Sequence, residues 1–137
     1  MKIVNQKTTG RVSLLFALTL AFALLLPSAV HATQCLSSVE SSADLSATAT
    51  TGSDVAISVT PSGSCSSGEI SSLSLSYQPN TLTVSNPSTG SYSGINTGVT
   101  KSFTVTASTT GVYNITAVGT TSDGSVEASP LFIEFVA

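Results

Sequence analysis

Apolar and polar residues alternate along most of the chain with a period of two. In the segment DVAISVTP, residues 54–61, Val55, Ile57 and Val59 share one face, and small or polar residues occupy the other. Successive side chains of a β-strand point to opposite faces, so this alternation predicts a strand with one buried face. The same alternation predicts strands at 72–79, 81–84, 101–107, 112–118 and 130–136, and a weaker run predicts a first strand at 45–50.

Short turn-forming sequences separate these segments. They are Ser62-Gly63, Asn86-Pro87, Thr89-Gly90, Asn96-Thr97-Gly98 and Asp123-Gly124. No helical periodicity of 3.6 residues follows residue 32. Six or seven short strands with frequent turns in about 100 residues predict an all-β fold, a single antiparallel β-sandwich of about seven strands. Serine and threonine then fill the outward strand positions, where their hydroxyl groups face water.

The first 32 residues differ in kind from the rest of the chain. Lys2, Lys7 and Arg11 precede an almost unbroken apolar run, and small residues follow up to Ala32. This order is typical of a secretory signal peptide, and the apolar run of about 15 residues is shorter than the roughly 20 that cross a bilayer. We therefore expect cleavage after Ala32. The expected parts are a signal peptide at 1–32, an N-terminal segment at 33–44 and the sandwich domain at 45–137.

A second interpretation of the N-terminus stays open. Cleavage after Gly10 would leave the apolar stretch as the assembly helix of a pilin-like subunit. Such a helix usually has an acidic residue near its start, where Leu15 stands here, and Pro27 would end it early. With cleavage after Ala32 instead, we expect no further association with the membrane.

The charge balance changes once the expected signal peptide is removed. Three of the four basic residues lie before residue 33, so one cation, Lys101, remains against seven acids, and the formal net charge is 1 − 7 = −6. Binding to nucleic acid depends on clustered lysine and arginine. The sequence therefore argues against a nucleic-acid partner.

The same region lacks the residues that catalysis and metal binding require. It contains no histidine and no arginine, and its many serines have no activating base nearby in sequence. We expect no enzymatic activity, no cofactor and no metal. Calcium is the cation that needs most consideration, because Asp123 and Glu127 lie close together, but Asp-Gly between two strands favours a hairpin turn.

The two cysteines are expected to form a disulfide bond. If the strands at 45–50 and 54–61 are an antiparallel pair, the chain just before the first lies beside the chain just after the second. Cys35 and Cys65 occupy those two places. They do not form a CxxC motif, so a structural bond is favoured over redox activity, and such a bond suits an exported protein.

The segment TTGVYNITA, residues 109–117, resembles the sixth strand of immunoglobulin-like (Ig-like) domains. In that family a glycine is followed two residues later by a tyrosine, as in Gly111 and Tyr113, and then by an inward residue at the place of Ile115. Antibody domains have a cysteine at that place and a buried tryptophan, and residues 33–137 contain no tryptophan. The chain is more similar to Ig-like and fibronectin type III modules of microbial secreted and surface proteins. The resemblance implies that the Tyr113 hydroxyl bonds to nearby upstream backbone.

Three positions are candidates for a functional role. Asn114 begins an Asn-X-Thr acceptor for N-glycosylation and is expected to point outward from its strand. Tyr92 lies in a glycine-rich segment and is the candidate ring for contact with a ligand. Phe132 and Val136 put apolar side chains on the outward face of the last strand, which indicates either a covered face or an assembly surface.

Together these features predict a secreted, non-catalytic Ig-like module. We expect a structural or adhesive component of a cell surface or extracellular assembly, with other extracellular proteins as partners and with self-association through an edge strand as one mode. The alternative is a module that binds carbohydrate or another small extracellular ligand, for which Tyr92 is the expected contact. A Ser- and Thr-rich fold of this kind hosts many functions, so the fold does not choose between them.

Overall fold

The computed structural model describes residues 33–44 and 48–137, so the expected signal peptide at 1–32 lies outside the described residues. Residues 33–137 form one compact unit. In its described part no helix is long and apolar enough to span a membrane. Its strands are β1 (Leu36–Ala43), β2 (Thr48–Thr50), β3 (Val55–Gly63), β4 (Ser72–Gln78), β5 (Leu82–Asn86), β6 (Ser91–Tyr92), β7 (Lys101–Ala107), β8 (Gly111–Thr121), β9 (Gly124–Glu127) and β10 (Leu131–Val136).

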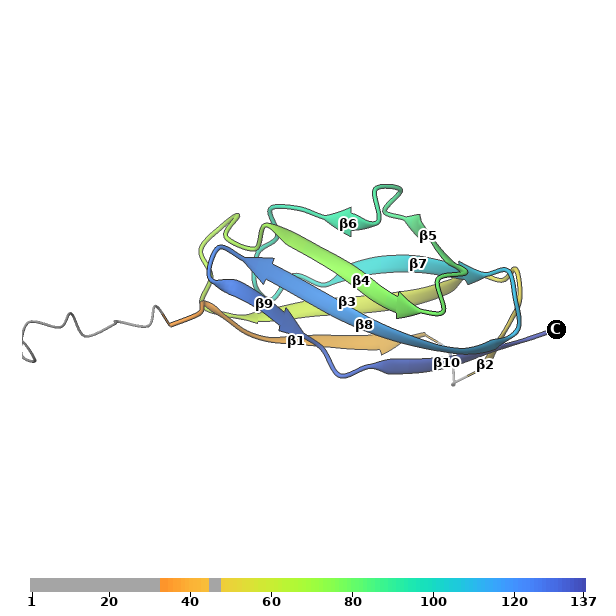
Figure 1. The fold of residues 1–137 in the computed structure, drawn as a ribbon. Coiled ribbons are helices and arrows are strands. Elements are labelled where there is room, and N and C mark those ends of the chain that lie inside the picture. The colour runs from red at the N-terminus through yellow and green to blue at the C-terminus, as the bar shows by residue number, and fades with distance from the viewer. Residues whose placement is uncertain (1–32, 45–47) are drawn as a thin grey trace, which may run out of the picture. The chain divides into compact units, whose positions relative to one another are not determined.

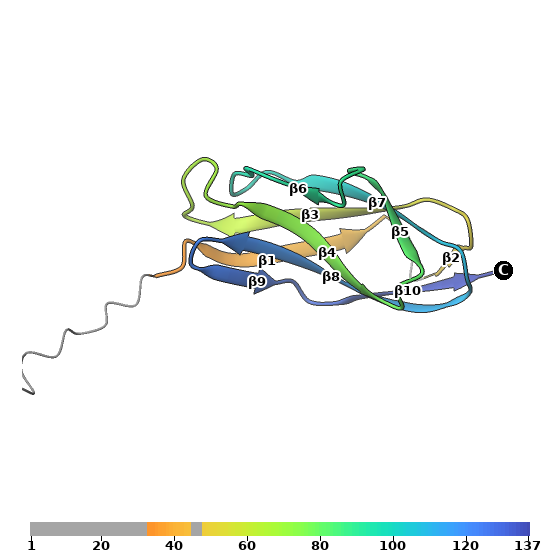
Figure 2. The same ribbon diagram turned by 45° about the horizontal axis from the view of Figure 1, so that its top comes forward.

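The strands form two sheets that pack face to face (Figures 1 and 2). The first sheet has the order β1-β3-β7-β5, and the second has the order β2-β10-β8-β4-β6, with β9 pairing with the second half of β8. All of these pairs are antiparallel except β2 with β10, which is parallel. The predicted all-β sandwich is therefore confirmed.

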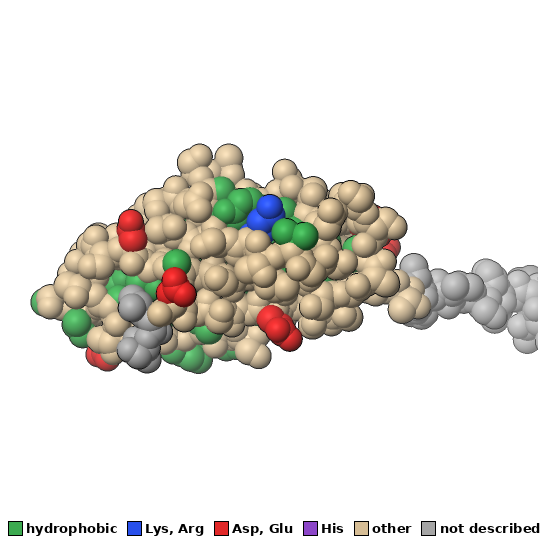
Figure 3. Space-filling model, turned by 180° about the vertical axis from the view of Figure 1, so that it is seen from behind, with side chains coloured by type: hydrophobic (Ala, Val, Ile, Leu, Met, Phe, Trp, Pro, Cys, Tyr) green, Lys and Arg blue, Asp and Glu red, His purple; other side chains and the backbone are tan. Residues whose placement is uncertain are grey.

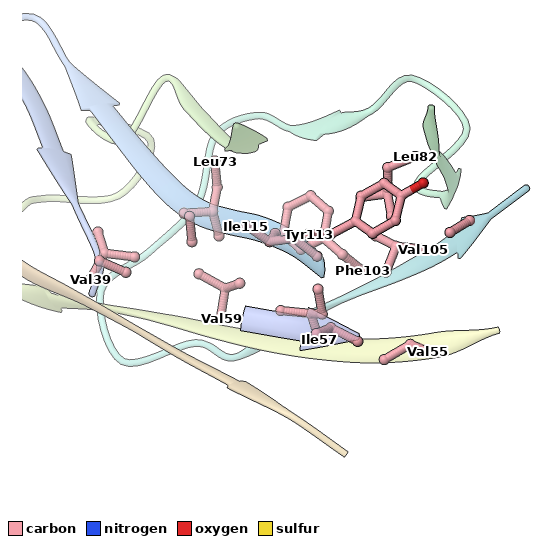
Figure 4. Close-up of a cluster of buried hydrophobic side chains, with 14 of the residues drawn as sticks. Val39, Val55, Ile57, Val59, Leu73, Leu82, Phe103, Val105, Tyr113 and Ile115 are labelled. Carbon is pink, nitrogen blue, oxygen red and sulfur yellow. The ribbon is translucent and has the colours of Figure 1, made fainter. Parts of the chain in front are cut away.

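The core lies between the two sheets and is formed by the inward members of the alternating pattern. Val55, Ile57 and Val59 on β3 are fully buried, as predicted, and face Tyr113 and Ile115 on β8 across the sandwich (Figure 4). The other buried apolar side chains are Leu36, Val39, Ala49, Ile70, Leu73, Leu82, Ile95, Phe103, Val105, Ala107, Ala117, Ala128, Ile133 and Phe135. Burial of this apolar surface is the main source of the domain's stability.

The sandwich includes a strand in the segment that we assigned to a region before the domain. β1 pairs with β3 over its whole length and contributes Leu36 and Val39 to the core. An irregularity between Leu36 and Ser38 puts the two buried side chains three residues apart. A search for period two misses such a strand, because a bulge shifts the alternation by one residue. The boundary expected at residue 45 is therefore wrong, and the sandwich begins at β1.

The weak strand expected at 45–50 exists in part but has a different partner. β2 does not pair with β3; it runs parallel to β10 in the second sheet, with Ala49 beside Phe135. The Thr51 amide extends the connection by donating to the Val136 carbonyl over 2.8 Å. The N-terminal part of the domain is thus shared between the two sheets.

The expected disulfide between Cys35 and Cys65 is present, with a Cα–Cα distance of 4.7 Å. The two residues lie at the same end of the sandwich because β1, rather than β2, pairs with β3. The Ser64 amide donates to the Cys35 carbonyl over 2.8 Å at this corner. Gly63 is required there, since its φ is +151° and a Cβ atom would stand 2.1 Å from the Cys35 carbonyl oxygen.

The segment at Asp123 forms a hairpin turn between β8 and β9, as expected, with Ser122 and Asp123 in the turn and Gly124 as the first residue of β9. Thr121 pairs with Gly124, and the Asp123 amide donates to the Thr121 hydroxyl over 3.2 Å. Glu127 lies at the end of β9 opposite Val118, on an exposed position. The geometry therefore supports the interpretation of this segment as a turn.

Candidate functional site

On the face that Figure 3 shows, uncharged polar side chains and backbone predominate and charged side chains are few. Among the described residues, Lys101 is the only lysine or arginine. Its ammonium group lies 5.3 Å from the centre of the Tyr92 ring, a cation–π distance. All seven acids are exposed: Glu40, Asp44, Asp54, Glu69, Asp123, Glu127 and Glu134.

One group of potential metal ligands occurs in the part of the chain that the structure describes. It consists of Cys35, Cys65 and Glu69, whose ligand atoms lie within 4.8 Å of one another. The two sulfur atoms are bonded to each other, so neither is the thiolate that a metal ion requires. Glu69 also accepts a hydrogen bond from the Ser66 amide. These three residues therefore have a structural role at the disulfide bond.

Tyr113 forms the corner contact that the Ig-like resemblance implies. Its side chain is fully buried, and its hydroxyl donates to the Thr109 carbonyl at 3.1 Å. The hydroxyl also lies 2.7 Å from the Thr81 hydroxyl and 2.8 Å from the Thr109 hydroxyl. The ring packs edge-on against Phe135, with centroids 5.3 Å apart. These contacts link the loop before β5 to the loop before β8.

Replacing Tyr113 with phenylalanine is expected to lower the free energy of unfolding by about 1–2 kcal/mol, because the hydroxyl of this buried side chain bonds to both Thr81 and Thr109 and all of these bonds are lost. Tyr92→Phe is the matched comparison. It removes one hydrogen bond, to the Ser102 carbonyl, from a half-buried ring, and should cost about 0.5–1 kcal/mol. Urea unfolding followed by circular dichroism measures both values. Equal losses in the two variants would contradict a special role of the corner.

Tyr92 is not the exposed ring that the sequence suggested. It lies on β6 and is half-buried, its hydroxyl donates to the Ser102 carbonyl over 2.7 Å, and its ring packs edge-on against Phe103 at 5.1 Å. Lys101 covers a face of the same ring. Glycine-rich composition indicated a loop, but contacts with β7, distant in sequence, hold the residue against the core. The carbohydrate hypothesis thus loses the free ring on which it depended.

The outward face of β8 and β10 carries three exposed apolar side chains, with the exposed Glu134 between two of them on β10. Val112 and Phe132 are each 59% exposed and Val136 is 38% exposed; we call these three residues the outer patch. Register places Phe132 opposite Asn114 and Glu134 opposite Val112. The sequence pointed to Phe132 and Val136 but missed Val112, although alternation from the buried Tyr113 puts it on the outward face.

The outer patch belongs to a face of the sheet and not to a free edge. β2 pairs with the second half of β10, where Glu134, Phe135 and Val136 are opposite Thr48, Ala49 and Thr50. Addition of a foreign strand along this part of β10 is therefore blocked. A partner of the outer patch would therefore meet the face of the sheet, and self-association through one of the outer strands β1, β5, β2 or β6 stays a prediction.

Asn114 lies beside the patch with its side chain exposed on the outward face of β8, as expected. Gln78 on β4 is opposite it on one side, and Phe132 on β10 is opposite it on the other. A shallow polar hollow of about 130 Å³ adjoins Asn114, and its lining also includes Ser76 and Thr116. This face thus combines an apolar cluster with a row of polar groups.

Comparisons with known proteins identify the architecture and no narrower group. No family model and no curated protein matches the chain. A solved structure described as the "D00-D0 domain of Intimin" matches with a TM-score of 0.53 at 14% sequence identity. The fold is Ig-like. The alignment covers 77% of this chain and 50% of the matched chain, so the present chain spans about half the length of that structure.

Proposed function

We propose that this chain is a secreted, non-catalytic Ig-like module that serves as a structural or adhesive component of a cell surface or extracellular assembly. The observation that carries the proposal is the outer patch, where Val112, Phe132 and Val136 are exposed together on the face of the second sheet. Exposed clusters of large apolar side chains favour contact with another macromolecule, because contact removes them from water. The partner is another extracellular protein or a further copy of this chain.

Two further features support this proposal. The disulfide is of the kind that persists outside the reducing cytoplasm. The start of β1 and the C-terminal end of the chain lie at opposite ends of the sandwich (Figures 1 and 2). A module with this arrangement of ends can be held at one end while it presents the other, as a spacer or a displayed domain requires.

The proposal predicts that the chain without any attached group associates through the outer patch. Size-exclusion chromatography with light scattering should show a species larger than the monomer, and Phe132→Ser should shift it to the monomer. Val99→Ser is the matched control, since Val99 is 41% exposed but lies between β6 and β7, away from the patch. A monomer for the unmodified wild type at every concentration, with no co-purifying surface protein, would overturn the proposal.

A further inference from the structure

Three outward side chains form a row across the middle of the second sheet. Asn114 is opposite Gln78 on β4 and opposite Phe132 on β10. Side chains directly opposite each other have Cβ atoms roughly 4.5–5.5 Å apart, close enough for a group attached to Asn114 to lie over the Phe132 ring. Asn114 is also the first residue of the Asn-Ile-Thr acceptor that continues to Thr116.

We propose that Asn114 carries an N-linked glycan whose first sugar packs on Phe132 and so removes the largest side chain of the outer patch from contact with a partner. The sugar would come from a lipid-linked oligosaccharide through an oligosaccharyltransferase of the exporting cell. A bond forms between Asn114 Nδ2 and the anomeric carbon of the sugar, the bond from that carbon to the lipid phosphate oxygen breaks, and the amide loses one proton. The phosphate leaves with the electron pair.

The environment of Asn114 suits both faces of a sugar ring. A pyranose presents C–H groups on one face, and these pack favourably on an aromatic ring such as Phe132, which is 59% exposed. Its hydroxyl and acetamido groups need polar partners. The hollow beside Asn114 supplies these from Ser76, Gln78 and Thr116. A single attached sugar can therefore satisfy the polar hollow and shield the apolar side chain together.

This inference rests on the proposed function, because it states when the outer patch is open to a partner. With the sugar in place, Phe132 is covered and the module stays monomeric. Without the sugar, the patch is free for association. Glycosylation of Asn114 thus regulates assembly. Thr116, as the third residue of the acceptor, determines whether Asn114 can be glycosylated.

The first test is made on protein exported by its own cells. Intact mass and peptide mapping should find a hexose- or hexosamine-containing adduct on the peptide that contains Asn114. An unmodified Asn114 in that protein would overturn the inference.

The second test compares full chains produced in a eukaryotic secretory pathway and in a bacterial periplasm without an oligosaccharyltransferase. The eukaryotic product should carry a sugar that peptide N-glycosidase removes, and both Asn114→Gln and Thr116→Val should prevent its attachment. Thr116→Ser, which retains the acceptor, is the matched control. The sugar should raise the thermal midpoint by roughly 3–6 °C when Phe132 is present and have no such effect in Phe132→Ser. Equal shifts in both backgrounds would overturn the contact with Phe132.

A measurement of association then distinguishes the proposed assembly function from the proposed regulation by the sugar. Light scattering should show a monomer for the glycosylated chain and a larger species for the periplasmic chain, for enzymatically deglycosylated protein and for Thr116→Val. If the sugar is attached but the sugar-free chain stays monomeric without a partner, the proposed assembly function fails while the glycosylation site stands. If the glycosylated and sugar-free chains associate equally, the regulatory inference fails while the assembly function stands.

Discussion

Gly63→Ala is expected to destabilise the domain by about 3 kcal/mol or more, which corresponds to a fall of roughly 10–15 °C in thermal midpoint. The new Cβ would stand 2.1 Å from the Cys35 carbonyl oxygen and 2.9 Å from the Ser37 amide nitrogen. Both neighbours are backbone atoms of β1 and its approach, so neither can turn away. β1 must move off β3, which also weakens the hydrogen bond from Ser64 to Cys35.

Gly52→Ala provides the matched control for this prediction. Gly52 also has a positive φ, +80°, but no atom lies within 4 Å of the position a Cβ would take. The cost there is limited to backbone strain of about 1–2 kcal/mol. Differential scanning calorimetry and quantitation of free thiols measure the two variants. Similar losses in both would show that the close approach of strands at Gly63 is unimportant.

Loss of the disulfide is expected to have an effect of similar size. Cys35 and Cys65 are separated by 30 residues in sequence. Removing a bond that closes such a loop should lower the free energy of unfolding by about 3–4 kcal/mol, because the unfolded chain regains conformational freedom. The double variant Cys35→Ala, Cys65→Ala should show this loss in denaturant unfolding.

Reduction of the wild type supplies the internal control for the disulfide. Dithiothreitol should reduce wild-type stability to nearly the level of the double alanine variant and should leave that variant unaffected. Unfolding midpoints that coincide for oxidised wild type and the double variant would contradict the prediction.

The sequence pattern predicted the central strands well because buried and exposed side chains alternate along them. On β3 and β8 every second residue is inward, so alternation revealed both strands and their buried faces. The corner role of Tyr113 was also predictable, since its hydroxyl partner at Thr109 lies only four residues upstream. Local spacing carries enough information in such cases.

Features that depend on distant contacts were not predictable in the same way. Alternation shows which face of a strand is buried but not which strand lies beside it, so the pairing of β2 with β10 was missed. The irregularity after Leu36 hid β1. Tyr92 was placed in a free loop because nothing near it in sequence indicates its bond to Ser102 or its packing on Phe103. The position of Asn114 opposite Phe132 likewise follows only from strand register.

The parallel pairing of β2 with β10 bears on how the domain is completed during its biogenesis. A chain that is synthesised or exported from its N-terminus presents β2 long before β10 arrives, so β2 has no partner in its own sheet until then. Buried Ile133 and Phe135 also reach the core only with β10. Structures closed by such distant contacts form late, because loop closure must precede the favourable pairing. The sandwich is therefore completed only after β10 has joined it.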